Sequence, residues 1–303
     1  MKSSILTLLL LIFATSCESQ STKIIIPLNE IRNKSHVTVT IDNTSIPNIL
    51  LDTGFAFDGL MIYNPDYKDS LDLTKAIKVK IPGAGGGEPS QASMTDSADF
   101  QLGNIEMKSQ RIIVLESDTY RGFPSNGLIG YSIFGHYITE FNYDNYTMIL
   151  HSTNSLEIDK SWTEIPLYFK KNNIPWLDAS VVIRDESPIS LSMYIDYASG
   201  DAIELLEKPD MKFRLPEETV NTYLGRGLSG DIYGKTGKIN KLIIGPYELK
   251  NVKASFAEAK IRSKQDNADA ILGIGSLRRF NLIFDYPNKK LYLKPNKHIN
   301  EPF

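Results

Sequence analysis

The two halves of this sequence repeat the same short motifs in the same order and at nearly the same spacing. In the first half an apolar run ends in Asp52-Thr53-Gly54, and Gly127-Leu128-Ile129-Gly130 begins 75 residues after Asp52. In the second half Tyr194-Ile195 ends in Asp196, and Ala270-Ile271-Leu272-Gly273 begins 74 residues later. Six further pairs match: Ile26 to Leu28 with Ile165 to Leu167, Val37 to Ile41 with Ala179 to Ile183, Gly83 to Gly85 with Gly225 to Gly227, Leu102 to Met107 with Ile244 to Leu249, Phe141 to Tyr143 with Phe284 to Tyr286, and Met148 to Leu150 with Leu291 to Leu293. The offsets all lie between 139 and 144 residues, which indicates a duplicated unit.

The repeated unit has the pattern of a β protein. Val37 to Ile41, Ala76 to Ile81 and Lys241 to Ile244 are β-branched or alternate between apolar and polar residues. Short helices are expected at Leu71 to Ile77, Ser132 to Phe134 and Ser276 to Arg279. The polar stretch Leu156 to Ser161 falls between the repeats and is the expected linker. The sequence therefore predicts an all-β fold with minor helix, in two pseudo-symmetric lobes at residues 22–155 and 162–303.

Residues 1–17 are typical of a bacterial lipoprotein signal peptide. Lys2 precedes an apolar core, Ile5 to Phe13, that is too short to span a bilayer. Ala14-Thr15-Ser16-Cys17 resembles a lipobox, and Cys17 is the only cysteine in the chain. Lipidation of Cys17 would explain this leftover thiol. The alternative is an ordinary signal peptide with an incidental cysteine. We expect a chain that is lipid-anchored in the cell envelope, either periplasmic or associated with the outer membrane.

Charge and motif searches exclude several classes of function. The net charge is -3 and no basic cluster occurs, which disfavours nucleic acid as a partner. The four histidines, His36, His136, His151 and His298, lack the spacing of metal ligands, so neither a metal nor another cofactor is expected. Gly225 to Gly230 fits G-x-G-x-x-G, but no amphipathic helix follows. Its alignment with the glycines of the first half favours a hairpin.

The motifs together resemble the pepsin and retropepsin clan of aspartic proteases. The resemblance rests on Ile49-Leu50-Leu51-Asp52-Thr53-Gly54, the glycine-bearing hairpin, and Leu128-Ile129-Gly130 followed by Phe141-Asn142-Tyr143. It covers residues 24–296 and is nearest to the duplicated, single-chain aspartyl-protease-like lipoproteins of Bacteroidetes-type bacteria. It implies two lobes around a cleft that binds a peptide or protein substrate. It also implies a monomer, because duplication supplies in one chain what a homodimer would otherwise supply.

The resemblance assigns roles to particular residues. Asp52 and Asp196 would share one proton and one water, so that one carboxylate activates the water while the other protonates the scissile carbonyl. Thr53 would tie the lobes together beneath the pair, and Gly54 would permit the tight turn. A flexible flap over the cleft is expected at Gly83, Gly85, Gly86 and Gly87, and a plain surface loop is the alternative.

The second aspartate motif departs from the pattern of the clan. Asp-Thr/Ser-Gly is expected, but the chain has Asp196-Tyr197-Ala198. Tyr197 cannot make the short buried hydroxyl bond of a threonine. Ala198 would cost about 1–2 kcal/mol if the turn needed a positive φ. The sequence therefore leaves two functions open, an aspartic-type endopeptidase and a non-catalytic peptide-binding lipoprotein with a degenerate cleft.

Overall fold

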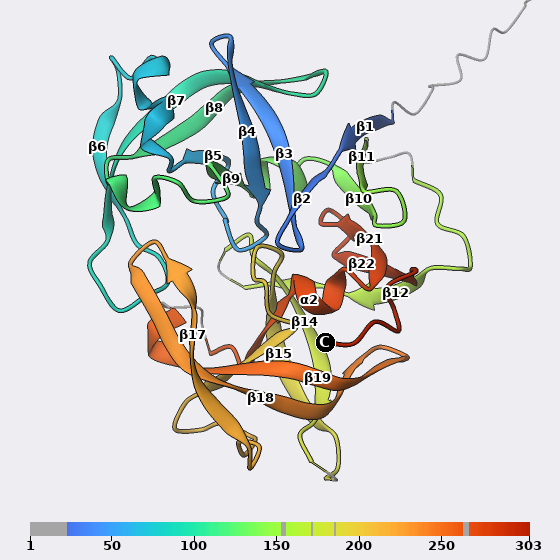
Figure 1. Ribbon diagram of the computed structural model, residues 1–303. Coiled ribbons are helices and arrows are strands. Elements are labelled where there is room, and N and C mark those ends of the chain that lie inside the picture. Colours follow the sequence, from blue (N-terminus) through green and yellow to red (C-terminus); the bar gives the residue numbers. More distant parts are fainter. Residues whose placement is uncertain (1–22, 153–155, 171, 185, 263–266) are drawn as a thin grey trace, which may run out of the picture.

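The computed structural model describes residues 23–152, 156–170, 172–184, 186–262 and 267–303. Two eight-stranded sheets form the two lobes (Figure 1). The first has the order β2 (Asn29–Ile31), β3 (Lys34–Ile41), β4 (Thr44–Leu51), β9 (Gly127–Ile129), β5 (Gly59–Ile62), β8 (Ile105–Leu115), β7 (Ser90–Leu102), β6 (Ile77–Ile81). The second has the order β13 (Tyr168–Phe169), β14 (Pro175–Val182), β15 (Ile189–Asp196), β20 (Ala270–Gly273), β16 (Ile203–Glu207), β19 (Tyr247–Glu258), β18 (Gly230–Ile244), β17 (Thr219–Gly227). The two orders correspond strand by strand, and the predicted all-β, two-lobe class is confirmed.

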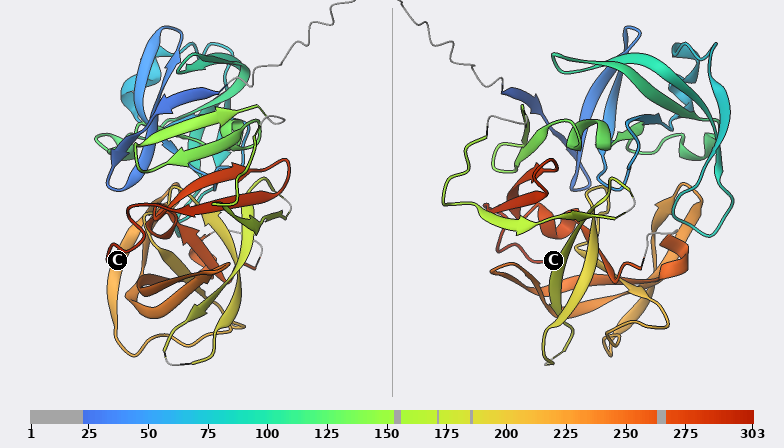
Figure 2. Two further views of the ribbon diagram at one scale, coloured as in Figure 1. Left: turned by 90° about the vertical axis from the view of Figure 1, so that its right-hand side faces the viewer. Right: turned by 180° about the vertical axis from the view of Figure 1, so that it is seen from behind.

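A third sheet of six strands takes members from both halves of the chain. Its order is β1 (Ile24–Pro27), β11 (Thr147–His151), β10 (Ile138–Asn142), β21 (Phe280–Asp285), β22 (Lys290–Pro295), β12 (Thr163–Pro166). The halves meet where β10 pairs with β21, with Phe141 opposite Leu282. This shared sheet lies between the lobes in the side view (Figure 2). Its backbone hydrogen bonds therefore fix how the lobes are placed relative to each other.

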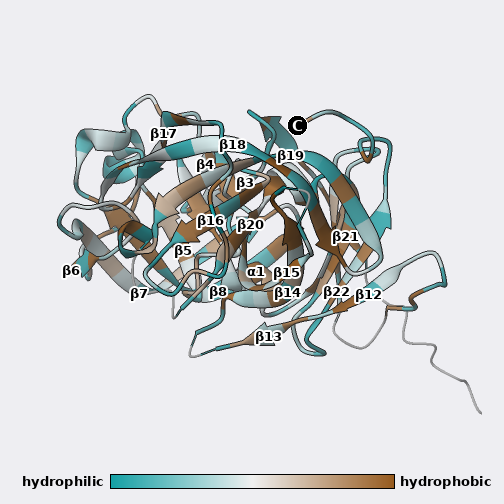
Figure 3. Ribbon diagram, turned by 90° about the horizontal axis from the view of Figure 1, so that it is seen from below, coloured by the Kyte–Doolittle hydropathy of each residue, from teal (hydrophilic) through white to brown (hydrophobic). Residues whose placement is uncertain are grey.

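Aromatic side chains fill the junction between the lobes. The ring centroids of Phe141 and Tyr197 are 4.7 Å apart, and those of Phe134 and Phe284 are 5.3 Å apart. All four side chains are buried. Apolar residues gather along the inner strands, while the outer loops are polar (Figure 3). Such ring pairs add about 0.5–1.5 kcal/mol each beyond the burial of their area.

In the part of the chain that the structure describes, helix is confined to short turns. These are α1 (Tyr131–Phe134), α2 (Ile274–Leu277) and three 3₁₀ turns, η1 (Pro65–Ser70), η2 (Asp118–Tyr120) and η3 (Ala259–Arg262). The helices expected near Ser132 and Ser276 overlap α1 and α2. The helix expected at Leu71 to Ile77 is wrong. The Asp72 carboxylate accepts the backbone N–H of Thr74 at 3.0 Å, a local turn that competes with a helix, and Ile77 already begins β6.

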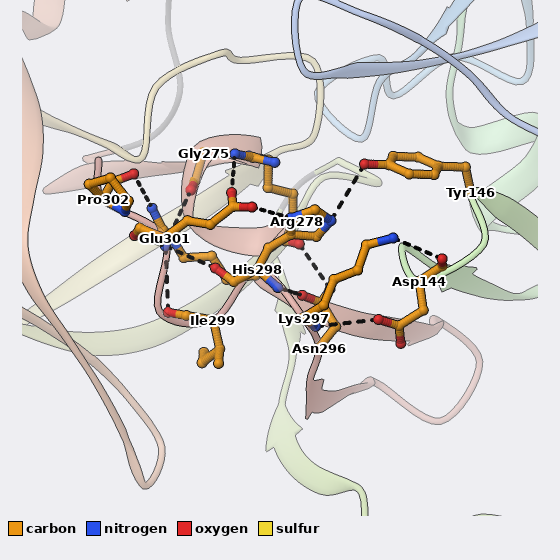
Figure 4. A network of polar contacts seen from close by, with 11 residues as sticks. Asp144, Tyr146, Gly275, Arg278, Asn296, Lys297, His298, Ile299, Glu301 and Pro302 are labelled. Atoms are coloured by element: carbon orange, nitrogen blue, oxygen red, sulfur yellow. Dashed lines mark hydrogen bonds and ion pairs between the residues drawn. The ribbon is translucent and has the colours of Figure 1, made fainter.

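The C-terminal segment after β22 contacts both halves of the chain (Figure 4). The buried Arg279 guanidinium donates to the backbone oxygens of His298 and Pro302, each at 3.1 Å. Lys297 Nζ donates to the backbone oxygen of Asp144 in the first half, at 2.9 Å. The tail therefore adds a further connection between the halves, besides the shared sheet and the aromatic junction.

Candidate active site

Asp52 and Asp196 lie together in a cleft between the lobes. Asp52 directly follows β4, Asp196 ends β15, and both line the same cavity of about 590 Å³. A Cβ atom placed on Gly54 would lie 3.0 Å from Asp52 Oδ1 and 3.8 Å from Asp196 Oδ2. The two carboxyl groups thus approach each other across the Gly54 turn. This follows from the repeat, because each aspartate stands at the end of an equivalent strand.

Backbone donors orient both carboxyl groups. Gly54 N–H donates to Asp52 Oδ1 at 2.7 Å. The N–H groups of Ala198 and Ser199 donate to Asp196 Oδ1 at 3.0 and 2.9 Å. Ala198 is not among the residues with positive φ, so the conformational cost considered for this position does not arise. The second motif therefore holds its aspartate without a glycine.

Thr53 joins the lobes beneath the aspartates. Its hydroxyl donates to the Ile195 carbonyl at 2.7 Å and accepts the Tyr197 backbone N–H at 2.9 Å. The side chain of Tyr197 extends from the second lobe toward the first, into the junction between the lobes. There its buried hydroxyl contacts Tyr143 Oη and lies 3.3 Å from Ser35 Oγ. Tyr197 therefore forms a cross-lobe hydrogen bond of its own, with partners other than those of a threonine.

The Asp52 carboxyl has an unusual acidity. Burial and the nearby Asp196 carboxylate raise the pKa of Asp52 from 3.8 to about 8, although the Gly54 N–H acts in the opposite direction. Two close carboxyl groups in a desolvated site cannot both ionise easily. The pair therefore holds one proton at neutral pH, which is the state that acid/base chemistry requires.

Asp52→Asn is expected to raise the melting temperature, by an amount that grows between pH 3.8 and pH 8. The unfolded chain releases this proton near pH 3.8, whereas the folded chain keeps it until about pH 8, so the wild-type fold loses stability across that window. The loss is at most about 1.4 kcal/mol for each pH unit. Asparagine has no proton to release. Thermal unfolding of both proteins across this range checks the effect, and a pH-independent difference would contradict the raised pKa.

The predicted flap loop, residues 82–89, reaches across the cleft to the tip of the β17–β18 hairpin. Ser229 of the hairpin donates its N–H to Ala84 O at 2.9 Å, and its own backbone oxygen accepts the Gly87 N–H at 2.6 Å. Gly83 N–H donates to Ser229 Oγ at 3.1 Å. Gly225 to Gly230, the G-x-G-x-x-G match, forms this hairpin tip. In Figure 1 the loop after β6 meets the hairpin. One loop from each lobe thus covers the cleft.

Gly85→Ala is expected to separate the flap loop from the hairpin. Gly85 has a φ of 114°, and a Cβ atom there would lie 2.5 Å from Gly230 N. We expect amide exchange at Ser229 to accelerate by about tenfold or more, because its hydrogen bond to Ala84 is lost. Gly86→Ala is the matched control, since its Cβ would meet nothing closer than 4.0 Å. Equal exchange in both variants would show that the loops are not coupled.

Several residues that line the cleft were not singled out by their sequence pattern. His36, one of the four histidines without metal-ligand spacing, is buried with its Nε2 2.8 Å from Ser125 Oγ, and burial lowers its pKa. Lys34 and Arg262 border the same cavity. These residues carry no motif, and only the fold brings them to the aspartates. Among the described residues, no group of three potential metal ligands lies close together.

No model of a known protein family matches the chain, and neither does any curated protein sequence. Across the described ranges, no helix is both long enough and apolar enough to cross a membrane. Cys17 and the expected signal peptide lie outside the residues that the structure describes.

Proposed function

We propose that this protein is an aspartic-type endopeptidase that hydrolyses peptide bonds with a water activated between Asp52 and Asp196. The observation that carries the proposal is the approach of these two carboxyl groups at equivalent strand ends in one cleft. The pepsin and retropepsin resemblance of the motifs points to the same chemistry. A buried carboxylate pair is costly for folding, which favours a functional role over a structural one.

The environments of the two aspartates suggest which of them donates a proton and which accepts one. Asp52, with its raised pKa, holds the shared proton and donates it to the scissile carbonyl oxygen. Asp196 accepts two backbone N–H bonds, which suit a carboxylate, and takes a proton from the attacking water. The water adds to the carbonyl carbon to give a diol. Asp196 then passes its proton to the amide nitrogen and Asp52 takes back a hydroxyl proton as the C–N bond breaks, which releases the amine and the carboxylic acid and leaves the pair with one proton. Neither step needs a covalent intermediate with the protein.

The cleft, covered by the flap loop and the hairpin, suits an extended peptide. Its floor carries the aspartates, and the flap loop and hairpin close over it, so a bound chain would be shielded from water. Entry requires the hydrogen bonds between Ser229 and the flap loop to open. We propose that the chain acts as a monomer, since both aspartates come from one polypeptide.

The function is tested with the full chain, purified in mild detergent and incubated with a mixed peptide library between pH 3 and pH 9. Mass spectrometry of the products identifies any cleaved bonds. Cleavage that depends on both aspartates would support the proposal. Absence of cleavage at every pH, with measurable peptide binding, would favour the alternative of a non-catalytic binding protein. The substituted Tyr197-Ala198 motif is the feature that favours this alternative.

We further propose that a lipid on Cys17 anchors the protein in the bacterial cell envelope. Cys17→Ser is expected to move the protein from the membrane fraction to the soluble fraction, because stable attachment needs the multiply acylated terminus of a lipoprotein. Cell fractionation followed by immunoblotting measures the shift. Retention of the variant in the membrane fraction would contradict the anchor.

A further inference from the structure

The strand pairing relates the two walls of the cleft residue by residue. Leu60 pairs with both Ile129 and Ile112, and Ile203 pairs with both Leu272 and Ala254. Leu60 and Ile203 are therefore equivalent positions in the two lobes. At the next residue of each strand, Met61 is equivalent to Glu204, and their pairing partners Ile113 and Ser255 are equivalent to each other. The 3₁₀ turns that follow β8 and β19 end at Tyr120 and Arg262. Each wall thus has the same three positions, which are Met61, Ile113 and Tyr120 in the first lobe and Glu204, Ser255 and Arg262 in the second.

The wall of the first lobe is apolar. Met61, Ile113 and Tyr120 are buried in one cluster with Phe55 and Ile81. Met61 and Tyr120 border the cavity directly. A large apolar side chain of a substrate would be desolvated against this wall.

The wall of the second lobe is charged. Glu204 is fully buried and accepts two hydrogen bonds from Arg262, one from Nε and one from Nη2. Burial opposes the charge of Arg262, but this pair raises the pKa of its guanidinium. Arg262 borders the cavity, and within the described ranges its Nη1 makes no hydrogen bond to the protein. Glu204 thus fixes the guanidinium of Arg262, whose Nη1 has no acceptor among the described residues and can donate to a ligand.

Lys34 adds a second cation on this side of the cleft. A Cβ atom on Gly200, four residues after Asp196, would lie 3.4 Å from Lys34 Cε, and Lys34 lines the cavity. Across the described chain Lys34 forms no ion pair. Asp201 also lines the cavity, and its Oδ2 accepts the Ser255 hydroxyl at 2.7 Å. Burial raises the pKa of Asp201, while the charges of Arg262 and Lys34 act in the opposite direction. Lys34 and Arg262 are therefore two cations that line this part of the cavity, beside the carboxyl groups of Asp196 and Asp201.

We infer that the second-lobe half of the cleft binds an acidic side chain of the peptide, an aspartate or a glutamate, between Lys34 and Arg262. The apolar wall of the first lobe takes a large apolar residue on the other side of the scissile bond. The inference rests on the proposed peptide-binding function and adds its substrate class. A carboxylate in this place gains charge-assisted hydrogen bonds that the isosteric amide of glutamine cannot match.

The test compares peptides that are identical except for glutamate or glutamine beside the cleaved bond. We measure kcat/KM with the wild-type chain, and binding to the Asp52→Asn protein by fluorescence anisotropy. We expect a preference for glutamate of about tenfold or more in both measurements. Lys34→Gln should reduce this preference. The double variant Glu204→Met/Arg262→Tyr, which copies the first lobe, should abolish it, since apolar replacement of a whole buried ion pair is well tolerated. Arg111→Gln is the matched control and should retain the preference, since Arg111 of β8 forms an exposed pair with Asp96 of β7.

The outcomes separate this inference from the proposed function. Cleavage without a preference for glutamate, or with a preference that both cleft variants retain, would overturn the inference and leave the endopeptidase standing. Glutamate-selective binding without cleavage would support the inference and contradict the endopeptidase. If the double variant does not fold, a preference unchanged in Lys34→Gln alone overturns the proposed site. Absence of both cleavage and binding would contradict both.

Discussion

Asp52→Asn is expected to abolish peptide hydrolysis, with a fall in kcat of about 1,000-fold or more. The asparagine side chain has nearly the same shape as aspartate, and its amide oxygen can still accept the Gly54 N–H that now reaches Asp52 at 2.7 Å. It has no exchangeable acid proton to pass to the scissile carbonyl. Steady-state cleavage of a peptide found in the library measures the loss, and circular dichroism shows that the fold is retained.

Asp196→Asn should cause a loss of similar size, because the two carboxyl groups act as one unit and their losses do not add. Asp58→Asn is the matched control, since Asp58 forms a surface pair with His136 at 2.9 Å. Its activity should equal that of the wild-type chain. Cleavage that survives Asp52→Asn would rule out the aspartic mechanism.

The duplicated pattern was sufficient to predict the two lobes and the meeting of the two aspartates. Asp52 and Asp196 occupy the same place in two copies of one unit, so a pseudo-two-fold arrangement brings them to one cleft. The pairing of β4 with β9 and of β15 with β20 is parallel in both lobes, as equivalent motifs require. Local periodicity and motif order were enough for these features because each depends on short stretches of chain.

Other parts of the site depend on contacts between distant residues that no local pattern reveals. Arg262 reaches Glu204 across 58 residues, and Ser229 meets the flap loop from the other lobe. Nothing near Glu204 in the sequence marks it as buried, because the same short strand also carries Glu207, which is only partly buried. The difference between the two walls of the cleft appeared only when strand pairing made the lobes comparable residue by residue.

The second aspartate turn differs from the pattern of the pepsin and retropepsin clan. That pattern has a glycine after the threonine or serine, yet here Ala198 and Ser199 both donate to Asp196 Oδ1 without a positive φ. The turn is satisfied by a different set of backbone donors. Tyr197 likewise looks out of place when its motif is considered alone. Its hydroxyl has hydrogen-bond partners, Tyr143 and Ser35, but they lie in the other lobe.

Tyr197→Thr, which restores the residue that the pepsin and retropepsin pattern expects, is therefore expected to destabilise the protein by about 3–5 kcal/mol. The Tyr197 ring is fully buried between the lobes and packs against Phe141, with 4.7 Å between ring centroids. A threonine side chain would leave most of that volume empty and would leave the Tyr143 hydroxyl without its partner. The Thr53 bonds to Ile195 and to the Tyr197 backbone do not depend on the ring and should persist.

Tyr197→Phe separates the contribution of the hydroxyl from that of the ring. It keeps the packing and removes only the hydrogen bonds to Tyr143 and Ser35, so we expect a loss of about 1–2 kcal/mol. Denaturant unfolding of the three proteins measures both differences. If Tyr197→Thr were as stable as the wild-type chain, the packing of this ring between the lobes would not contribute to the stability of the fold. If Tyr197→Thr loses peptide cleavage while Tyr197→Phe keeps it, the position of Asp196 depends on the packed ring, and the threonine of the pepsin and retropepsin pattern cannot replace it.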